Sequence, residues 1–258
     1  MDWTDKNIIQ LLLKDGRIPQ KRIADELKIS PQALKYRFNK LIDDGIIKKF
    51  VLHVNPEFYG NTQGFAAFIT DHDYNDDIFS RFRCLEDISI FGFHGNDKNE
   101  LERILKKAYD KLGPPIMNYT PPASAKLINV SDLDRKVIEA LRVDPRISVA
   151  SLAKKLNISS SSAKKRIERL KEKRVASVIP ILDLSKTDAV IFLIFSNKPE
   201  SIMPAIERSL IFQISDSTAG IAVCFSESLD AAKKLIVNAR KMDEKSRVMV
   251  VYDYDFLN

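Results

Sequence analysis

The residues with the clearest chemical potential form one basic stretch in the second half of the sequence. Between Lys164 and Arg174, seven of eleven positions hold Lys or Arg. Side chains at this density can neutralise nucleic-acid phosphates, although a single basic helix is often only a solvated surface. The chain of 258 residues carries 41 Lys and Arg against 35 Asp and Glu, and 22 of the basic residues follow position 130. The charge pattern therefore favours nucleic acid as a partner, provided that the fold can present this stretch.

Residues that could support catalysis or bind a metal are too scattered to form a recognisable site. The acidic segment 71–77 lacks the glycine turn and the terminal Glu of a calcium loop, and no glycine-rich phosphate loop or Gly-x-Ser-x-Gly turn occurs. Cys84 and Cys224 stand 140 positions apart, as expected for reduced thiols of a cytoplasmic protein. The histidines have no carboxylate or cysteine partner at ligand spacing, and they are His53, His72 and His94. We therefore expect no enzyme activity, no cofactor and no metal site.

The sequence contains an internal repeat. A shift of 129 positions aligns residues 5–47 with 134–176 without a gap, and 13 of these 43 positions are identical. The identities fall mostly at apolar positions and at positions that suit helix caps. They include Asp5 and Asp134, Arg17 and Arg146, Ser30 and Ser159, and Arg37 and Arg166. Because the offset is half the chain length, we interpret the chain as a duplicated two-part unit.

Each repeat predicts three helices followed by a strand. A helical apolar stripe starts each copy, a short second helix is expected at 19–27 and 148–156, and a tight turn leads to a third helix capped by Ser30 or Ser159. The segments 45–52 and 175–182 suit a β-wing. The third helices are expected to bury Leu34, Phe38, Leu41 and Ile42 in one copy and Ala163, Ile167 and Leu170 in the other. Two short helices joined by a tight turn, the second of them basic, are typical of a helix-turn-helix.

The outward face of each third helix then supplies the candidate DNA contacts. Its amide, phenol, hydroxyl, carboxylate and basic side chains can reach base edges and phosphates in a major groove. Arg37 and Arg166 stand at the border of this face. The predicted DNA-binding residues are Gln32, Lys35, Tyr36, Arg37, Asn39 and Lys40 in the first copy and Ser161, Lys164, Lys165, Arg166, Glu168 and Arg169 in the second.

These residues resemble the winged helix-turn-helix of the Lrp/AsnC (feast–famine) transcription regulators. The similarity is carried by Asp5-x-x-Ile8-Ile9, Asp15-Gly16-Arg17-Ile18, Ile23-Ala24, Ile29-Ser30, Arg37, Leu41, Gly45-Ile46-Ile47 and Val54-Asn55-Pro56-Glu57-x-x-Gly60. The second copy matches over 134–184, with Arg174 where the family prefers Gly. The resemblance implies double-stranded DNA as partner and a small βαββαβ effector or dimerisation module after each DNA-binding module.

The remaining segments follow that plan unevenly. In the second half, apolar and amphipathic stretches between 189 and 254 occur in the order βαββαβ, whereas the first half leaves only 76–95 for a helix and two strands. We therefore predict an α+β chain in which each winged helix-turn-helix is followed by a ferredoxin-like βαββαβ-type module, the first of them trimmed. The predicted boundaries are 1–60 and 131–184 for the winged helix-turn-helix domains, 61–123 and 185–258 for the α/β modules, and 124–130 for the linker.

The resemblance also defines the partners and the alternatives. Family members that bind amino acids do so near a Gly-x-x-Asp turn, but Gly220 is followed by Val223 and Gly92 by Gly95, so a small-molecule effector stays open. The two α/β modules are expected to pair within the chain, with homodimer formation also open. Sirohaem decarboxylases resemble the same family and form the enzymatic alternative, although the second α/β module has no histidine. No apolar run exceeds seven residues, so we expect a cytoplasmic regulator without a membrane span, which reads two unlike half-sites.

Overall fold

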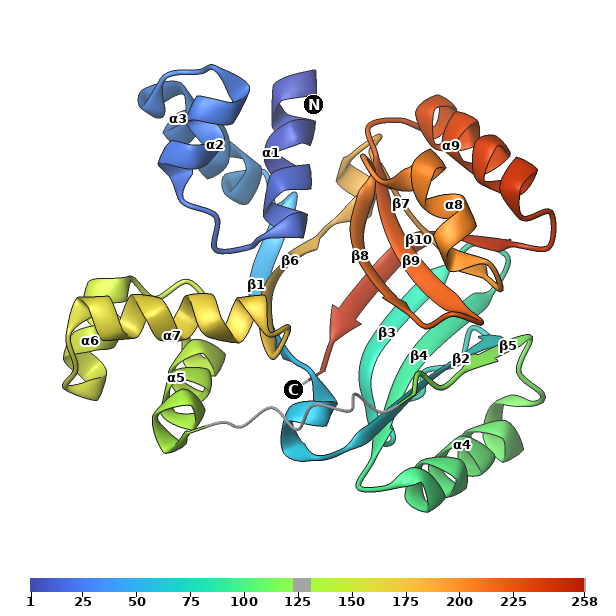
Figure 1. Cartoon of the computed structure of the whole chain (residues 1–258). Coiled ribbons are helices and arrows are strands. Elements are labelled where there is room, and N and C mark those ends of the chain that lie inside the picture. The colour runs from blue at the N-terminus through green and yellow to red at the C-terminus, as the bar shows by residue number, and fades with distance from the viewer. Residues whose placement is uncertain (123–130, 258) are drawn as a thin grey trace.

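The computed structural model describes residues 1–122 and 131–257. The predicted linker at 124–130 lies outside the described residues, and the predicted domain boundaries stay a prediction. Figure 1 shows the two helix-turn-helix regions on one side of the molecule and the two α/β modules on the other. The first region comprises α1 (Trp3–Lys14), α2 (Gln20–Leu27), α3 (Pro31–Asp43), β1 (Ile47–Val54) and the 3₁₀ helix η1 (Pro56–Tyr59). The second comprises α5 (Asp132–Val143), α6 (Val149–Leu156), α7 (Ser160–Glu172), β6 (Ala176–Leu182) and η2 (Leu184–Lys186).

The helix starts follow the capping residues that the sequence indicates. The Ser30 hydroxyl accepts a hydrogen bond from the Ala33 amide at the start of α3, and the Ser159 hydroxyl accepts one from the Ser162 amide at the start of α7. The tight turn before each third helix begins at a residue with a left-handed backbone, Lys28 in one copy and Asn157 in the other. These local signals define both helix-turn-helix units from sequence alone.

The buried faces of the third helices are confirmed except at one position. Leu34, Phe38 and Leu41 are buried, and Ala163 and Leu170 are buried in the second copy. The expectation for Ile42 is wrong, because 41% of this residue is exposed. At about 100° per residue, Ile42 lies about 80° around the helix from Leu34, at the edge of the stripe that faces α1 and α2. In the second copy, Ile167 is half-buried beside its cluster.

The segments expected to form wings are strands, but they pair with each other. β1 and β6 form a two-stranded antiparallel ribbon between the two helix-turn-helix regions. Val51 pairs with Ile179, and moving both residues by the repeat offset gives Phe50 and Pro180, which also pair. The ribbon therefore has a pseudo-twofold axis at its centre, and each copy completes the other copy's strand pair.

The residue that ends the turn after each third helix differs between the copies. Gly45 and Arg174 occupy equivalent positions, and both have a left-handed backbone, with φ of 70° and 53°. A residue with a Cβ atom loses about 1 kcal/mol in this conformation relative to glycine.

We expect Arg174→Gly to raise the free energy of unfolding by about 1 kcal/mol, because it removes this strain. Urea denaturation followed by circular dichroism measures the change. Arg174→Ala removes the same charge but keeps the Cβ atom, and it should leave the stability within about 0.5 kcal/mol of the parent chain. Equal stabilisation by both variants would assign the gain to charge instead of backbone conformation.

The α/β modules have the predicted fold, and the first is trimmed as expected. The second runs β7 (Val190–Ser196), α8 (Pro199–Ile206), β8 (Leu210–Ser215), β9 (Gly220–Ser226), α9 (Leu229–Met242) and β10 (Arg247–Phe256). The first runs β2 (Thr62–Ile69), β3 (Ile78–Cys84), β4 (Ile88–Gly95), α4 (Lys98–Leu112) and β5 (Met117–Tyr119), with no helix between β2 and β3. All described module strands form one antiparallel sheet of order β5-β2-β4-β3-β10-β7-β9-β8, in which β3 and β10 join the two modules.

An extended loop takes the place of the absent helix in the first module. Within it, Tyr74 is buried against Phe91 and Phe93, whose ring centroids lie 5.7 and 6.0 Å away. Asp73 pairs with Arg81 on β3, and Asp76 pairs with two lysines of α4. One aromatic side chain and a few ion pairs therefore cover the sheet where the second module uses α8.

The inner faces of the two modules pack against each other. Ala67 and Met117 from the first module share one core cluster with Leu193 and Met249 from the second, and Leu12 of α1 belongs to it as well. The intrachain pairing of the two α/β modules is thus confirmed. β5 and β8 are the two edge strands of this sheet, and they are not hydrogen-bonded to each other. The Tyr119 hydroxyl instead donates to the Asp216 carboxylate across this gap at 3.2 Å.

Candidate nucleic-acid interface

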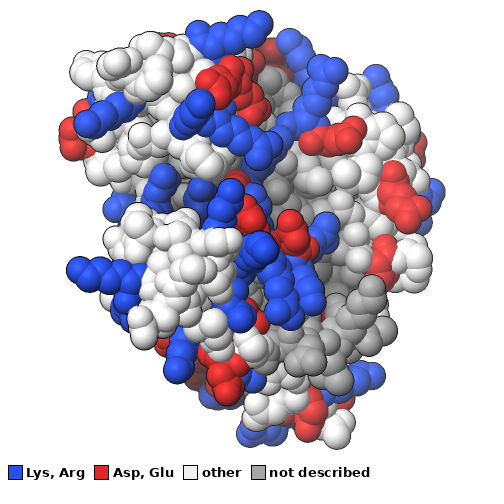
Figure 2. Space-filling view, turned by 60° about the vertical axis from the view of Figure 1, so that its left-hand side comes forward, with Lys and Arg blue, Asp and Glu red and all other residues white. Residues whose placement is uncertain are grey.

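The two third helices, α3 and α7, present polar faces on the side of the molecule that the helix-turn-helix regions occupy. Figure 2 shows this side, with Lys and Arg gathered across its middle and acidic side chains among them. Most of the predicted contact residues are exposed, and Tyr36 is 69% exposed. The exposed members are Gln32, Lys35, Tyr36, Asn39 and Lys40 on α3 and Ser161, Lys164, Lys165 and Glu168 on α7. The structure therefore brings each predicted set onto one accessible helix face.

Arg37 and Arg166 differ from the other predicted contacts because intramolecular ion pairs hold both. Arg37 Nη1 lies 2.9 Å from Asp5 and 2.7 Å from Asp2, and these carboxylates raise the pKa of Arg37. Arg166 Nη1 lies 2.8 Å from Asp134 Oδ1. Asp5 and Asp134 are equivalent residues of the first and second copies. The same pair thus ties the third helix to the first helix in both copies, which gives these arginines a structural role that the sequence pattern alone does not reveal.

Asp134 is the most enclosed charged group in this region, with a side chain only 2% exposed. Burial raises its pKa, but hydrogen bonds from Arg166 and from the Ser131 amide and hydroxyl outweigh burial, so the net effect is a lowered pKa. Arg169 also approaches this carboxylate, at 3.6 Å. Asp134 therefore stays ionised and anchors the central turn of α7.

The remaining lysines of α7 differ in the ion pairs that they form. Lys164 lies 3.8 Å from Glu168, a long ion pair on an exposed surface, which contributes little to stability. Lys171 pairs at 2.5 Å with Asp15 of the first copy. Among the described residues, Lys165 makes no ion pair. Lys165 is therefore the residue of α7 best placed to gain a phosphate partner.

The two faces differ in chemistry at equivalent positions. Gln32, Tyr36 and Asn39 of α3 correspond to Ser161, Lys165 and Glu168 of α7. A carboxamide suits adenine, a carboxylate accepts from the cytosine amino group, and a lysine suits guanine or phosphate. The pseudo-twofold axis relates the two helices in space, but the groups they offer to DNA are not the same.

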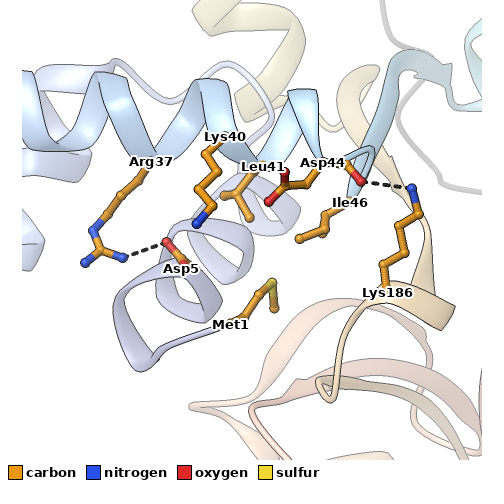
Figure 3. Close-up of a pocket in the computed structure, with 8 residues that line it drawn as sticks. All are labelled: Met1, Asp5, Arg37, Lys40, Leu41, Asp44, Ile46 and Lys186. Carbon is orange, nitrogen blue, oxygen red and sulfur yellow. Dashed lines mark hydrogen bonds and ion pairs between the residues drawn. The ribbon is translucent and has the colours of Figure 1, made fainter.

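A shallow cavity of about 260 Å³ lies beside the C-terminal half of α3 (Figure 3). Lys40 points into it, Arg37 and Asp5 form one wall, and Lys186 of η2 donates to the Asp44 carbonyl at 2.8 Å. The second copy thereby holds the end of the first copy's third helix. The cavity is lined by Met1, Asp5, Arg37, Lys40, Leu41, Asp44, Ile46 and Lys186.

Structural contacts surround several of the residues that the sequence offered for catalysis or effector binding. His53 and His94 flank the ring of Phe79, and burial lowers the pKa of His53 to about 4. Within residues 1–122 and 131–257, no group of three His, Cys, Asp or Glu side chains could hold a metal. A Cβ atom at Gly220 would lie 2.4 Å from Ser215 Cβ, so close packing across the β8–β9 hairpin explains that glycine. None of the described helices is long and apolar enough to cross a membrane.

Two residues that are identical in the two repeats, but were not among the predicted contacts, occupy the junction between the helix-turn-helix regions. Arg17 donates to carbonyl groups of the second copy, and Arg146 stacks on aromatic rings of the first. The sequence signal that could have pointed to these two arginines was their identity at equivalent positions of the repeat. Periodicity could not reveal the partners, because these lie about 100 to 130 positions away in the chain.

Comparison with protein families finds a winged helix-turn-helix DNA-binding model at residues 1–48 and 130–175. An uncharacterized HTH-type transcriptional regulator of Pyrococcus abyssi is 30% identical over 152 residues, which is 56% of this chain and 84% of that protein. The HTH-type transcriptional regulator FL11 of Pyrococcus furiosus is 38% identical over 60 residues, and LysM of Saccharolobus solfataricus is 42% identical over 57. These two alignments cover 23% and 22% of this chain and span 40% of each regulator's length.

Similar solved structures are more distant. The siroheme decarboxylase NirDL matches 97% of this chain and 91% of its own, with a TM-score of 0.48 and 13% identity. The leucine response regulatory protein LrpA of Mycobacterium tuberculosis matches 50% of this chain and 96% of its own, with a TM-score of 0.36 and 17% identity. These similarities are too low to carry a functional argument.

Proposed function

The chain belongs to the Lrp/AsnC-type helix-turn-helix transcription regulators, in a form with two helix-turn-helix segments, and on this premise we propose that it binds DNA sequence-specifically through two unlike half-sites. Both third helices expose a polar face, and the ribbon of β1 and β6 relates the two faces by a pseudo-twofold axis. The difference between these faces at equivalent positions is the observation that supports two unlike half-sites. The proposal includes a cytoplasmic location and involves no catalytic step.

The twelve predicted contact residues have different roles in this proposal. Base readout falls to Gln32, Tyr36 and Asn39 on α3 and to Ser161 and Glu168 on α7. Phosphate contacts fall to the exposed lysines and to Arg169, since phosphate contacts position a protein without specifying sequence. Arg37 and Arg166 contribute by orienting α3 and α7 through their ion pairs with Asp5 and Asp134.

Selection of bound fragments from genomic DNA tests the proposal. The purified chain is expected to enrich fragments that contain two half-sites of different sequence, centred about 10 base pairs apart or a multiple of that distance. A perfect palindrome would contradict two unlike helices, because it would mean that two chains place the same helix in both grooves. No enrichment over random fragments would contradict sequence-specific binding altogether.

Asn39→Ala should relax the base preference in one half-site only. A bidentate carboxamide–adenine pair discriminates against the wrong base by about 1–3 kcal/mol, whereas general affinity depends mainly on phosphate contacts. Titration of the selected site, and of variants with one changed base pair in each half, measures this preference. Glu168→Ala is the matched control, and it should relax the other half-site. Equal relaxation of both half-sites by either substitution would show that the helices are not assigned one to each.

A further inference from the structure

The two helix-turn-helix regions touch each other through equivalent loops. The α1–α2 loop, residues 15–19, meets the α5–α6 loop, residues 144–148, close to the ribbon of β1 and β6. Arg17 spans this contact with both terminal nitrogens of its guanidinium. Nη1 donates to the Pro145 carbonyl at 2.5 Å, and Nη2 donates to the Ile147 carbonyl at 2.6 Å.

Arg146, the repeat equivalent of Arg17, makes a different contact in the opposite direction. Its guanidinium carbon lies 5.0 Å from the ring centroid of Phe38 and 4.6 Å from that of Phe50. Phe38 belongs to the buried face of α3, and Phe50 belongs to β1. Arg146 of the second copy therefore packs directly against α3, which with α7 forms the pair of recognition helices of the proposed function.

The loops approach closely enough to define a single geometry. The Gly16 amide donates to the Val178 carbonyl at 3.1 Å, and a Cβ atom at position 16 would lie 2.3 Å from the same oxygen. Lys171 of α7 adds its ion pair with Asp15. The contact thus joins α7, β6 and the second loop to the first loop, with no room for a larger residue at Gly16.

Two arginines at one junction carry an electrostatic cost. Burial lowers the pKa of both guanidinium groups, and the neighbouring charge of Arg17 lowers the pKa of Arg146 further. Both stay charged, because arginine does not lose its proton in proteins. The two hydrogen bonds of Arg17 and the two ring contacts of Arg146 offset this cost and hold the two loops in one arrangement.

We propose that Arg17 and Arg146 are positioning residues that fix the separation and angle of the two recognition helices, and thereby set the spacer length between half-sites that the protein accepts. This inference rests on the proposed function. Five base pairs inserted between the half-sites turn one of them by about half a helical turn, to the opposite side of the duplex. A locked pair of helices cannot then engage both half-sites, whereas an unlocked pair can partly follow.

A series of DNA duplexes with the selected half-sites and increasing spacers tests this inference. For the parent chain, insertion of five base pairs should lower affinity about 100-fold, because the advantage of joining two binding modules is lost. For the Arg17→Ala/Arg146→Ala double variant, the same insertion should lower affinity about tenfold or less. Arg22→Ala removes a positive charge from the exposed face of α2, and its spacer dependence should match that of the parent chain.

A conservative variant, Arg17→Lys, tests the positioning role even if the double variant does not fold. Arg17→Lys preserves the charge but can bridge only one carbonyl at a time, so its spacer dependence should lie between those of the parent chain and the double variant. Far-ultraviolet circular dichroism reports whether the helices of each variant are folded.

The outcomes distinguish the inference from the proposed function. Spacer dependence that is unchanged in folded Arg17→Lys and in the double variant would overturn the positioning role. A parent chain that binds both half-sites equally well at every spacer would also overturn it, while leaving sequence-specific binding intact. A parent chain with no preference for the selected half-sites would overturn both.

Discussion

Asp134→Ala is expected to lower the free energy of unfolding by about 3 kcal/mol, the lower end of the range for breaking a buried ion pair. The substitution leaves Arg166 without its carboxylate partner and removes the acceptor for the Ser131 amide and hydroxyl. The lower end applies because the Arg166 side chain is 25% exposed and water can partly solvate it. Urea denaturation followed by circular dichroism measures the loss.

The equivalent substitution in the first copy is the control. Asp5→Ala removes the same contact between first and third helices, but Arg37 keeps Asp2 at 2.7 Å, and Asp5 is more exposed than Asp134. We therefore expect a loss of about 1 kcal/mol. Equal losses for the two variants would show that the enclosure of Asp134 has no energetic consequence.

The same carboxylate predicts a pH dependence. Because the folded-state pKa of Asp134 is lowered, its contribution to stability is fully present above the unfolded pKa near 3.8 and is lost as the pH falls through the folded-state pKa. The stability difference between the parent chain and Asp134→Asn should therefore be constant from about pH 5 to 7 and shrink below about pH 4. A difference that grows as the pH falls would show that folding raises the pKa of Asp134 instead of lowering it.

Replacing Lys164 and Lys165 together by alanine should weaken DNA binding about ten- to a hundredfold at low salt, on every DNA sequence alike. Each lysine that neutralises a phosphate releases counterions, so the slope of log affinity against log salt should flatten by about one to two units. Fluorescence anisotropy titrations between about 50 and 200 mM salt measure both effects.

A charge-matched variant separates local contact from net charge. Lys233→Ala/Lys241→Ala removes two lysines from α9, which lies on the α/β side of the molecule, and should leave the slope unchanged. If the variant with Lys164 and Lys165 replaced keeps the parent slope, these two lysines remain solvated when the parent chain binds DNA. At the predicted contact positions, α7 has one more basic residue than α3, because Lys165 stands where α3 has Tyr36, and we therefore expect α7 to contribute more of the salt slope than α3.

The local architecture was predictable because its signals are short-range. The caps at Ser30 and Ser159 and the apolar stripes lie within about ten residues of the structure they specify, and the repeat shows the same signals twice. Both helix-turn-helix units follow from them. The trimmed first module was predictable because only residues 76–95 were left for a helix and two strands. Ile42 was misplaced because periodicity gives a direction around a helix but not the width of the surface that covers it.

Contacts between the copies could not be predicted from the same signals. An apolar strand such as β1 specifies that it will pair, but not that its partner is β6, about 130 residues away. Likewise, the basic border residue Arg37 looks available for DNA until the fold brings Asp2 and Asp5 against it. The predicted site residues were therefore right in their exposure at most positions, whereas their intramolecular partners required the structure.

The join between β3 and β10 changes how the protein responds to dilution. Two modules on separate chains find each other in proportion to their concentration, and they dissociate once that concentration falls below their dissociation constant. Modules on one chain meet at an effective concentration that the tether sets, whatever the number of molecules in the cell. If one chain is the binding unit, the occupancy of a DNA site at low abundance rises with the first power of the number of chains, whereas an assembly from separate halves would follow the square.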